Sequence, residues 1–307
     1  MDNSTVRELI AAGIHFGHRM GRWNPKMKPY IFCCRNSIHI IDIKQTIKGL
    51  LRSKKFLADV VSSGKDVLFV GTKRQARQPI ISQADRCGMP YVTERWLGGT
   101  LTNFRTIRSR LSRLEELEDM DTKGLLSAQS KKMESTLRRE MNKIRRNLNG
   151  IRKMDQMPGA LVLIDAKREL IAIHEARKLH IPTICLIDTD SDPDLVGLPI
   201  PGNDDAMRAI ELVTTVLADA ILEGKAAQSK QDDGEAEEAP RRSRRLSTTR
   251  AAKAPPSQPD TTTTPQAPPS DAVVETAPAE GEASATMDAL QPGTPAADNP
   301  QEADKSP

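Results

Sequence analysis

The sequence predicts an α/β fold in which a parallel sheet has helices on both faces. Within the first 225 residues, short runs of Val, Ile and Leu alternate with longer stretches of helical periodicity. The runs DVLFV, ALVLI and TICLI contain few polar residues, as is typical of strands that are buried on both faces of a parallel sheet. Strand–helix alternation then joins neighbouring strands by right-handed crossovers.

The individual elements are expected in alternating order along the chain. In its first part we expect a strand at 38–41, a helix through 47–60, a strand at 66–70, a helix from 74 to 87 and an extended segment at 90–92. In its second part we expect a strand at 160–164, a helix ending at 179, a strand at 183–187, a short strand at 198–200 and a helix from 203 to 224. Gly64 and Gly88 stop the first two helices, because glycine readily adopts the left-handed conformation that ends a helix.

The alternation stops between residues 99 and 159, where two apolar seams predict an inserted hairpin. Apolar residues recur at spacings of three and four from 104 to 114 and again from 137 to 151. This spacing predicts an antiparallel coiled-coil hairpin over 103–153. Residues 105–153 hold 14 Lys and Arg against 7 Asp and Glu. Such a charge run is either a solvated helix face or a surface for an anionic partner, and the length and charge of this hairpin favour the partner.

The composition changes near residue 225, and the remaining residues are expected to form a disordered tail. Residues 226–307 hold 12 of the 21 prolines and no aromatic residue. They carry 8 Lys and Arg against 14 Asp and Glu, whereas residues 1–225 carry 37 against 27, so a body of net charge +10 precedes a tail of −6. Too little apolar surface is available in the tail to offset its ordering entropy. The predicted organisation is an α/β domain of residues 1–102 and 154–225, the inserted hairpin 103–153 and the tail 226–307.

Composition also excludes several classes of protein. No window approaches about 18 consecutive apolar residues, so we expect no contact with the interior of a membrane. The first residues, MDNSTVRELI, lack the basic and apolar regions of a secretory signal. The four cysteines, of which Cys33 and Cys34 are adjacent, form no recognisable disulfide framework. We therefore expect a cytoplasmic protein with reduced thiols.

The glycine-rich loops of nucleotide-binding enzymes are missing from the sequence. The turn Gly71-Thr72-Lys73-Arg74 holds one glycine, where the dinucleotide fingerprint needs three. A nucleophile elbow of the G-x-S-x-G type is missing as well. We predict neither an enzyme nor a bound cofactor. The two cations of this turn and the N–H groups of the helix that follows favour contact with a nucleic-acid phosphate.

The acidic run at 188–194 resembles the start of a calcium loop but does not complete it. Pro193 and Pro199 stand where such a loop needs glycine and glutamate. The carboxylates are therefore expected to cap turns at the carboxyl edge of a strand, and no metal is predicted. His15 and His18 are expected to bind backbone or phosphate. The alternative is a metal ion held by these two histidines with Asp188, Asp204 or Asp205.

Basic and aromatic side chains alternate near the N-terminus, in a pattern that favours RNA. Residues 15–36 contain five cations with two rings between them: Arg19, Arg22, Lys26, Lys28 and Arg35, with Trp23 and Tyr30. Pro25 and Pro29 are expected to hold this segment extended, so that the cations follow phosphates while the rings stack or pack beside sugars. Phe32 is expected in the core. Trp23 is either a core residue or an exposed stacking surface.

Several longer motifs resemble the universal S-two family of small-subunit ribosomal proteins. In chain order they are LIAAGIHFGHR at 9–19, RWNPKMKPYIF at 22–32, FVGTKRQA at 69–76, RWLGGTLTNF at 95–104, PGALVLIDAKRELIAIHEARKLHIP at 158–182, DTDSDPD at 188–194 and IPGNDDAMRAI at 200–210. The resemblance covers about residues 1–225, and the long hairpin is similar to the bacterial form of the family.

The resemblance implies both a fold and a function. It implies a flavodoxin-like sheet of five parallel strands with a protruding helical hairpin. It also implies a structural, non-enzymatic protein on the small ribosomal subunit, held by small-subunit ribosomal RNA beside other ribosomal proteins. Members of the family support late subunit assembly and help to dock ribosomal protein S-one. The alternatives are a free RNA chaperone or translation regulator, and an α/β nucleotide-binding enzyme.

The predicted RNA-binding residues lie in the N-terminal segment, in the turn at 71–74, and in the hairpin with the loop before it. They are Arg19, Arg22, Trp23, Lys26, Lys28, Lys73, Arg74, Arg95, Arg105, Arg108, Arg138, Arg139, Arg145 and Arg146. Each cation is expected to neutralise a phosphate without reading a base. Because ribosomal RNA repels an acidic tail, deletion of residues 226–307 is expected to leave binding to the small subunit largely intact.

Overall fold

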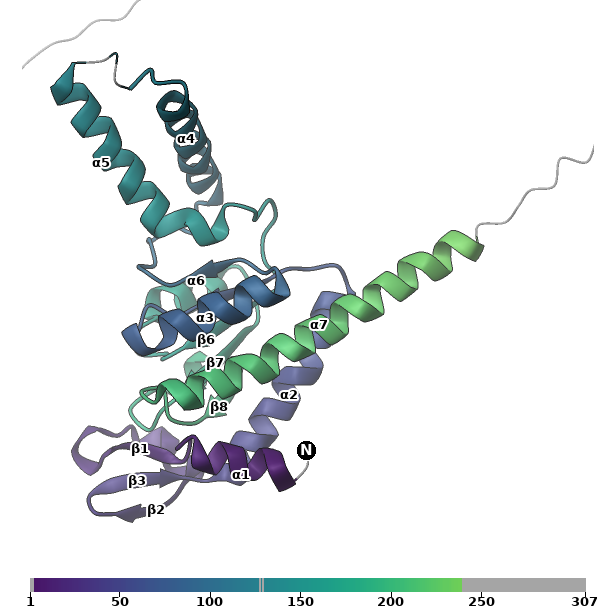
Figure 1. Cartoon of the computed structure of the whole chain (residues 1–307). Coiled ribbons are helices and arrows are strands. Elements are labelled where there is room, and N and C mark those ends of the chain that lie inside the picture. The colour runs from purple at the N-terminus through teal and green to yellow at the C-terminus, as the bar shows by residue number, and fades with distance from the viewer. Residues whose placement is uncertain (1–2, 127, 129, 239–307) are drawn as a thin grey trace, which may run out of the picture. The chain divides into compact units, whose positions relative to one another are not determined.

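A five-stranded parallel sheet forms the centre of the α/β body (Figure 1). The computed structural model describes residues 3–126, 128 and 130–238. The sheet order is β5-β4-β6-β7-β8. Numbered along the chain, these strands have the order 2-1-3-4-5 of flavodoxin-like folds. Their bounds are β4 Val67–Val70, β5 Tyr91–Val92, β6 Ala160–Ile164, β7 Thr183–Ile187 and β8 Leu198–Pro201.

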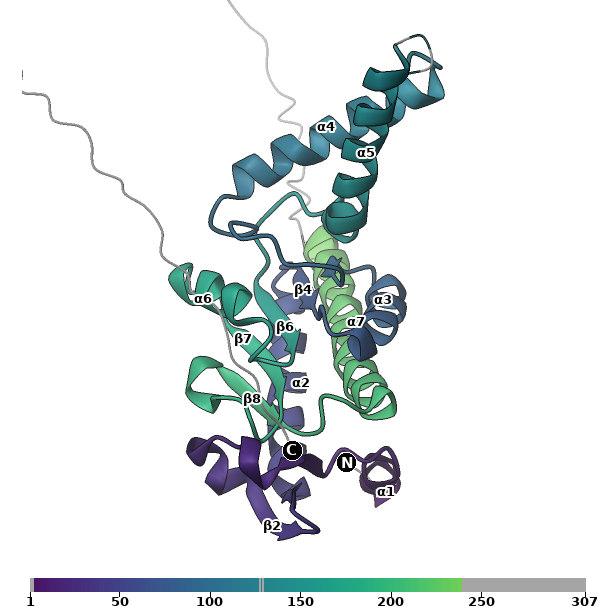
Figure 2. The same cartoon turned by 90° about the vertical axis from the view of Figure 1, so that its left-hand side faces the viewer.

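The predicted parallel sheet with helices on both faces is confirmed. Every residue of β4, β6 and β7 is buried, which explains why their sequences are unbroken apolar runs. Val67 and Phe69 face one core, while Leu68 and Val70 face the other. The first core lies under α1 (Asn3–Ala11), α2 (Ile43–Ser62), α3 (Arg74–Cys87) and α7 (Met207–Glu238). On the opposite face lies α6 (Leu170–Lys178) (Figure 2).

A second, antiparallel sheet was not predicted. It consists of β1 (Phe16–Arg19), β2 (Ile31–Arg35) and β3 (Ile38–Ile41), in the order β1-β3-β2. Residues 38–41 are therefore a strand, as predicted, but they pair outside the parallel sheet. Asn36 and Ser37 join β2 to β3 with φ angles of 50° and 61°. Two successive positive φ angles are the requirement of a tight hairpin turn, and asparagine tolerates them better than most residues.

Two expectations about the N-terminal segment are wrong. Residues 20–22 and 25–30 form the 3-10 turns η1 (Met20–Arg22) and η2 (Pro25–Tyr30), so the segment is not extended. Pro25 starts η2 without losing a hydrogen bond, and the Asn24 side chain accepts one from the Lys26 N–H (3.0 Å). Phe32 is not a core residue, because 75% of its surface is exposed on the edge strand β2.

The two predicted hairpin helices are present. They are α4 (Phe104–Thr122) and α5 (Lys131–Leu148), which run in opposite directions, and the short turn η3 (Asn149–Ile151) follows them (Figure 1). The predicted seam residues from 107 to 114 and from 137 to 151 that lie on these elements form one buried cluster with the α6 side of the sheet. The hairpin is therefore anchored by apolar packing that is continuous with the α/β core.

The last helix differs from its prediction at both ends. α7 begins at Met207 instead of residue 203, because Asn203 caps the turn before it by accepting hydrogen bonds from the Asp205 and Ala206 N–H groups (2.8 and 3.0 Å). Gly224 does not end the helix. It lies inside α7 against α2, where an added Cβ would lie 2.8 Å from the Ala58 carbonyl oxygen. Residues 226–238 of the predicted disordered tail are therefore helical, and residues 239–307 lie outside the described part of the chain.

Short elements complete the described chain. The turn η4 (Pro193–Leu195) connects β7 to β8. Within the described residues, no helix combines the length and apolar character needed to cross a bilayer.

Candidate nucleic-acid interface

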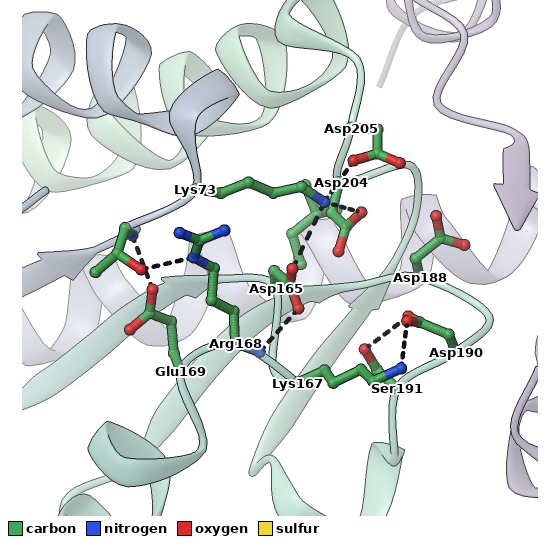
Figure 3. Close-up of polar contacts among 12 residues, drawn as sticks. Lys73, Asp165, Lys167, Arg168, Glu169, Asp188, Asp190, Ser191, Asp204 and Asp205 are labelled. Atoms are coloured by element: carbon green, nitrogen blue, oxygen red, sulfur yellow. Dashed lines mark hydrogen bonds and ion pairs between the residues drawn. The ribbon is translucent and has the colours of Figure 1, made fainter. Parts of the chain in front are cut away.

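The carboxyl ends of the parallel strands bring together residues that are far apart in sequence. Lys73 follows β4, Asp165 follows β6, and Asp204 and Asp205 follow β8 (Figure 3). The Lys73 Nζ lies 2.7 Å from Asp204 Oδ1, 2.6 Å from Asp205 Oδ1 and 3.5 Å from Asp165 Oδ2. One lysine therefore neutralises part of a three-carboxylate cluster.

This network determines the charge state of Lys73. Burial lowers the pKa of Lys73, but the neighbouring carboxylates, Asp204 first, raise it more, so the ammonium group stays charged. Burial raises the pKa of Asp204 to about 7, although Lys73 opposes this shift. Only 9% of Lys73 is exposed. Lys73 is thus engaged internally, and the geometry argues against its predicted role as a phosphate ligand.

The backbone of the 71–74 turn is also engaged internally. The Thr72 N–H donates to Glu169 Oε1 (2.8 Å), and Arg168 Nε donates to the Thr72 hydroxyl oxygen (2.9 Å). Of the two cations predicted to meet phosphate here, Arg74 alone is exposed.

His18 joins the acidic cluster from the N-terminal sheet. Its Nδ1 lies 2.7 Å from Asp188 Oδ2, and this hydrogen bond is the main cause that raises the pKa of His18 to about 9. His18, Asp188 and Asp204 offer ligand atoms within 4.8 Å of one another, a set that could hold a metal ion. His15 is not part of this set. Asp188 and Asp204 are already paired with His18 and Lys73, so the described arrangement is a closed ion-pair network.

The acidic run at 188–194 binds the N-terminal segment and caps its own turn. Lys26 Nζ lies 2.8 Å from carboxylate oxygens of both Asp192 and Asp194. Asp192 also accepts a hydrogen bond from the Asp194 N–H (3.0 Å). Thr189 accepts hydrogen bonds from the backbone N–H groups of His18, through its hydroxyl, and of Asn24, through its carbonyl (2.9 and 2.8 Å). The expectation that these carboxylates cap turns is confirmed.

Free cations remain on the N-terminal sheet. Arg19 and Arg22 line a hollow of about 730 Å³ with Ser37, and Lys28 is exposed nearby in sequence. None of these three cations has a carboxylate within ion-pair distance among the residues that the structure describes. Trp23 is 38% exposed and packs against His39, with ring centroids 5.3 Å apart, so it is a half-exposed ring beside these cations.

A buried carboxylate on α6 organises the loop that leads into the hairpin. Glu175 accepts hydrogen bonds from Trp96 Nε1 (3.1 Å) and from the N–H groups of Gly99 (2.7 Å), Leu101 (3.0 Å) and Thr102 (3.1 Å). Burial raises the pKa of Glu175, but these donors lower it more, so the carboxylate is charged. The loop therefore has a fixed conformation, and Arg95 and α4 are positioned by it.

A cavity of about 760 Å³ lies where the hairpin base meets the carboxyl edge of the sheet. Four cations line it: Arg95, Lys143, Arg146 and Arg168. Glu94 also lines it, but its carboxylate is shared between Arg77 and Arg146, each 3.0 Å away. The cavity therefore has a net positive lining.

Other hairpin arginines are used within the hairpin. Arg145 pairs with Glu118 (2.8 Å), and Arg138 pairs with Glu134 (3.0 Å). Arg108 pairs with Asp155 (2.6 Å) and donates to backbone carbonyls. In contrast, Arg105 and Arg139 are exposed and have no carboxylate partner in the described part of the chain. Together with Arg146, which pairs with Glu94, four of the six predicted hairpin arginines are thus already engaged in ion pairs.

The structure therefore sorts the predicted site residues into three groups. Those exposed without a carboxylate partner among the described residues are Arg19, Arg22, Lys28, Arg74, Arg95, Arg105 and Arg139. Those exposed or half-buried with such a partner are Lys26, Arg108, Arg138, Arg145 and Arg146. Trp23 is half-exposed, and Lys73 is buried.

Sequence reasoning missed Lys143, Arg168 and Glu175. Glu175 had a readable signal, since it stands between the buried residues Ile173 and Ala176 on the apolar side of α6. A charged residue at such a position needs a partner. Lys143 and Arg168 had no such signal, because only the fold brings α5 next to the start of α6.

Comparisons with known proteins agree on one family. A family model described as "Ribosomal protein S2" matches residues 9–224. The chain is 54% identical over 240 residues to "Small ribosomal subunit protein uS2" of Rhodopirellula baltica, covering 78% of this chain and 92% of the relative. It is 50% identical over 239 residues to the protein of the same name in Endomicrobium trichonymphae, covering 78% and 98%. It is also 51% identical over 224 residues to "Small ribosomal subunit protein uS2c" of Porphyra purpurea, covering 73% and 93%.

Proposed function

The chain belongs to the ribosomal protein S2 family, and on this premise we propose that it binds small-subunit ribosomal RNA through cations that its own carboxylates leave free. The family and the relatives are named as proteins of the small ribosomal subunit, so the chain is a structural protein of that subunit and not an enzyme. The proposal concerns how it is held there. The observation that carries it is the division of the predicted cations into free and internally paired groups.

The proposed contact residues lie in the N-terminal segment (β1, η1 and η2), at the start of α3, in the loop before the hairpin, and on the hairpin. They are Arg19, Arg22, Lys28, Arg74, Arg95, Arg105 and Arg139, with Trp23 as a ring beside them. The paired hairpin cations and Lys26 contribute less, because a phosphate must first displace a carboxylate that already binds them. Lys73 is left out of the proposal, since its ammonium group is buried among three carboxylates.

These cations neutralise phosphates and release counterions, and the shape of the RNA selects the site. We place late subunit assembly, docking of ribosomal protein S-one and a cytoplasmic location on the ribosome in the same proposal, because the family resemblance implies them. Small subunits that lack this chain should then fail to retain protein S-one.

Salt dependence tests the set of proposed cations. The slope of log affinity against log salt is negative. The variant Arg105→Ala should make it shallower by roughly 0.7–0.9 for each phosphate that is no longer neutralised. The matched control is Arg145→Ala, which removes a cation paired with Glu118 and should change the slope less. Affinity for ribosomal RNA that does not vary with salt would overturn the proposal.

Fractionation on sucrose gradients separates the ribosomal function from a free RNA chaperone or regulator. The chain should remain on small subunits in stoichiometric amount after a salt wash. Loss from the subunits at moderate salt, with retained binding to free RNA, would favour the regulator.

A further inference from the structure

The cavity at the hairpin base lies at the place where open α/β sheets most often bind ligands. From β4 the chain continues to β5 on one side, and β6, the strand that comes next in sequence, pairs with β4 on the other side. Ligands of open α/β sheets bind at such a reversal of strand order, outside the carboxyl ends of the strands. Thr72 after β4 and Arg168 after β6 both line the cavity. Its volume of about 760 Å³ falls within the roughly 300–1,000 Å³ of small-molecule pockets.

The charge of the lining selects an anion. Glu94 is held by Arg77 and Arg146, and the Glu169 carboxylate accepts the Thr72 N–H. Arg95, Lys143 and Arg168 are left without a carboxylate partner in the described chain. Arg168, shown beside Glu169 in Figure 3, is held in place by the hydrogen bond from its Nε to Thr72. Three cations from three segments thus converge on one hollow.

The other lining groups suit a nucleobase. Asn142 and Asn147 on α5 line the cavity, and a carboxamide can both donate to and accept from the edge of a base. Ile171 adds an exposed apolar side chain. A single carboxylate of a protein partner would fill only a small part of this volume and would leave the amides unused.

We propose that this cavity holds one unstacked nucleotide of small-subunit ribosomal RNA. Arg95, Lys143 and Arg168 bind its phosphate, and the amides of Asn142 and Asn147 meet the edge of its base. The inference rests on the proposed RNA binding and adds a defined base-binding site to the proposed phosphate contacts.

Photo-crosslinking locates the nucleotide. The full chain is bound to small-subunit ribosomal RNA that contains 4-thiouridine, irradiated and digested, and the crosslinked peptides are identified by mass spectrometry. Crosslinks to the peptides that carry Trp96, Asn142 or Asn147 are expected. RNA binding with crosslinks elsewhere alone would overturn the inference and leave the proposed function intact, whereas loss of all RNA binding would overturn both.

An abasic substitution separates a nucleotide site from a phosphate contact. Removing the base at the crosslinked position should weaken binding about tenfold, because the stacking and hydrogen bonds of that base are lost. Unchanged affinity would show that only the phosphate is bound and would overturn the base site. Competition by a free nucleoside monophosphate that abolishes the crosslink while RNA stays bound would support it.

Two variants test the residues. Arg95→Ala with Lys143→Ala and Arg168→Ala should reduce affinity at least tenfold, whereas the control with Lys48, Arg52 and Lys55 of α2 changed to alanine removes the same charge and should reduce it by about twofold or less. The second variant, Asn142→Ala, keeps every charge. It should lower the crosslink yield without changing the salt slope, and an unchanged yield would contradict the role of the amide.

Discussion

Glu175 shows how one buried carboxylate can fix a functional loop. Its two oxygens accept hydrogen bonds from four residues of the 96–102 loop, which connects β5 to the hairpin. Hydrogen bonds to a charged acceptor are stronger than neutral ones, about 1.5–3 kcal/mol each. Arg95 directly precedes this loop, so its position depends on a carboxylate that is itself buried.

The variant Glu175→Gln tests this dependence. An amide replaces one acceptor oxygen with a donor, so at least one backbone N–H loses its partner. We expect the free energy of unfolding to fall by about 2–4 kcal/mol in urea denaturation. The control Glu211→Gln lies on an exposed position of α7 and should change it by less than about 0.5 kcal/mol. Equal effects of the two variants would contradict the role of Glu175.

The contribution of Glu175 to the free energy of unfolding should depend on pH. The donors of the loop hold the pKa of Glu175 below its ordinary value of 4.5. A lowered pKa in the folded state contributes stability above the unfolded value and loses it as the pH falls through the folded value. The difference in stability between the wild-type chain and Glu175→Gln should thus be constant above about pH 5.5 and shrink below pH 4.5. A difference that grows on acidification would contradict this.

We expect the acidic cluster to destabilise the fold when its cation, Lys73, is removed. Lys73→Met leaves Asp204 and Asp165 without their cation, and breaking a buried ion pair costs about 3–5 kcal/mol. Lys167→Met is the matched control, because Lys167 pairs with Asp190 (3.2 Å) at the surface and should cost about 1 kcal/mol or less. Urea denaturation of both variants measures the two losses in the free energy of unfolding. A smaller loss in Lys73→Met than in Lys167→Met would contradict the prediction.

At the scale of elements, the hairpin is anchored to the α/β core at its base only, through apolar packing. Its buried seam is continuous with the core through Leu148 and Ile151, whereas Leu117 and Leu137 lie nearer the turn that joins α4 to α5. Most of its ion pairs are exposed and contribute little. Stability should therefore decrease along the hairpin from its base towards that turn.

Hydrogen exchange tests this gradient. In Leu137→Ala, amide exchange should accelerate in the parts of α4 and α5 near the turn, while exchange in β6 and β7 stays unchanged. Leu148→Ala removes a similar volume at the base and should accelerate exchange in the whole hairpin, because large-to-small changes in a core cost about 2–5 kcal/mol. Identical exchange profiles of the two variants would exclude a gradient.

The elements also show what the sequence could predict. β4, β6, β7 and the hairpin helices were predicted because their apolar periodicity reports burial directly. β1 and β2 were missed because FGHR and IFCCR are largely exposed and show no alternation. Gly224 misled the prediction of α7, because a glycine needed for close packing against Ala58 has the same letter as one that ends a helix.

At the scale of the whole molecule, both cores are complete before the end of α7. The last residue of either buried cluster in the described chain is Ile221. Lys225 adds one hydrogen bond, from its Nζ to the Cys87 carbonyl oxygen (2.7 Å). This hydrogen bond ties α7 to the C-terminus of α3.

Two truncations follow from this arrangement. A chain that ends at Glu238 should unfold within about 2 °C of the full chain and keep its RNA affinity, because it retains every residue of the two described core clusters. A chain that ends at Gly224 lacks the Lys225 hydrogen bond and should unfold roughly 2–8 °C lower. Thermal denaturation and RNA binding of both chains check this, and a large destabilisation in the longer one would contradict it.

Predicting the candidate site was harder than predicting the sheet, for a physical reason. Residue type identified the cations, but their availability depends on carboxylates that are distant in sequence. Lys73 looked like a phosphate ligand until Asp165, Asp204 and Asp205 were brought beside it. Arg105 was free and Arg145 was not, although both lie on the same basic hairpin.

The ties between the N-terminal segment and the end of the sheet have a consequence for synthesis. The Asn24 N–H donates to the Thr189 carbonyl, and the Asn203 N–H donates to the Ile14 carbonyl. At about 5–20 residues per second, a ribosome adds Asn203 roughly ten to thirty-five seconds after Asn24. Before Thr189 and Asn203 are added, the basic segment has neither of these two partners. Nascent chains stopped before residue 188 should therefore lack the RNA affinity of Arg19 and Arg22, as filter binding of stalled chains can measure. The partners that hold the N-terminal segment in place are thus supplied only when most of the described chain has been made.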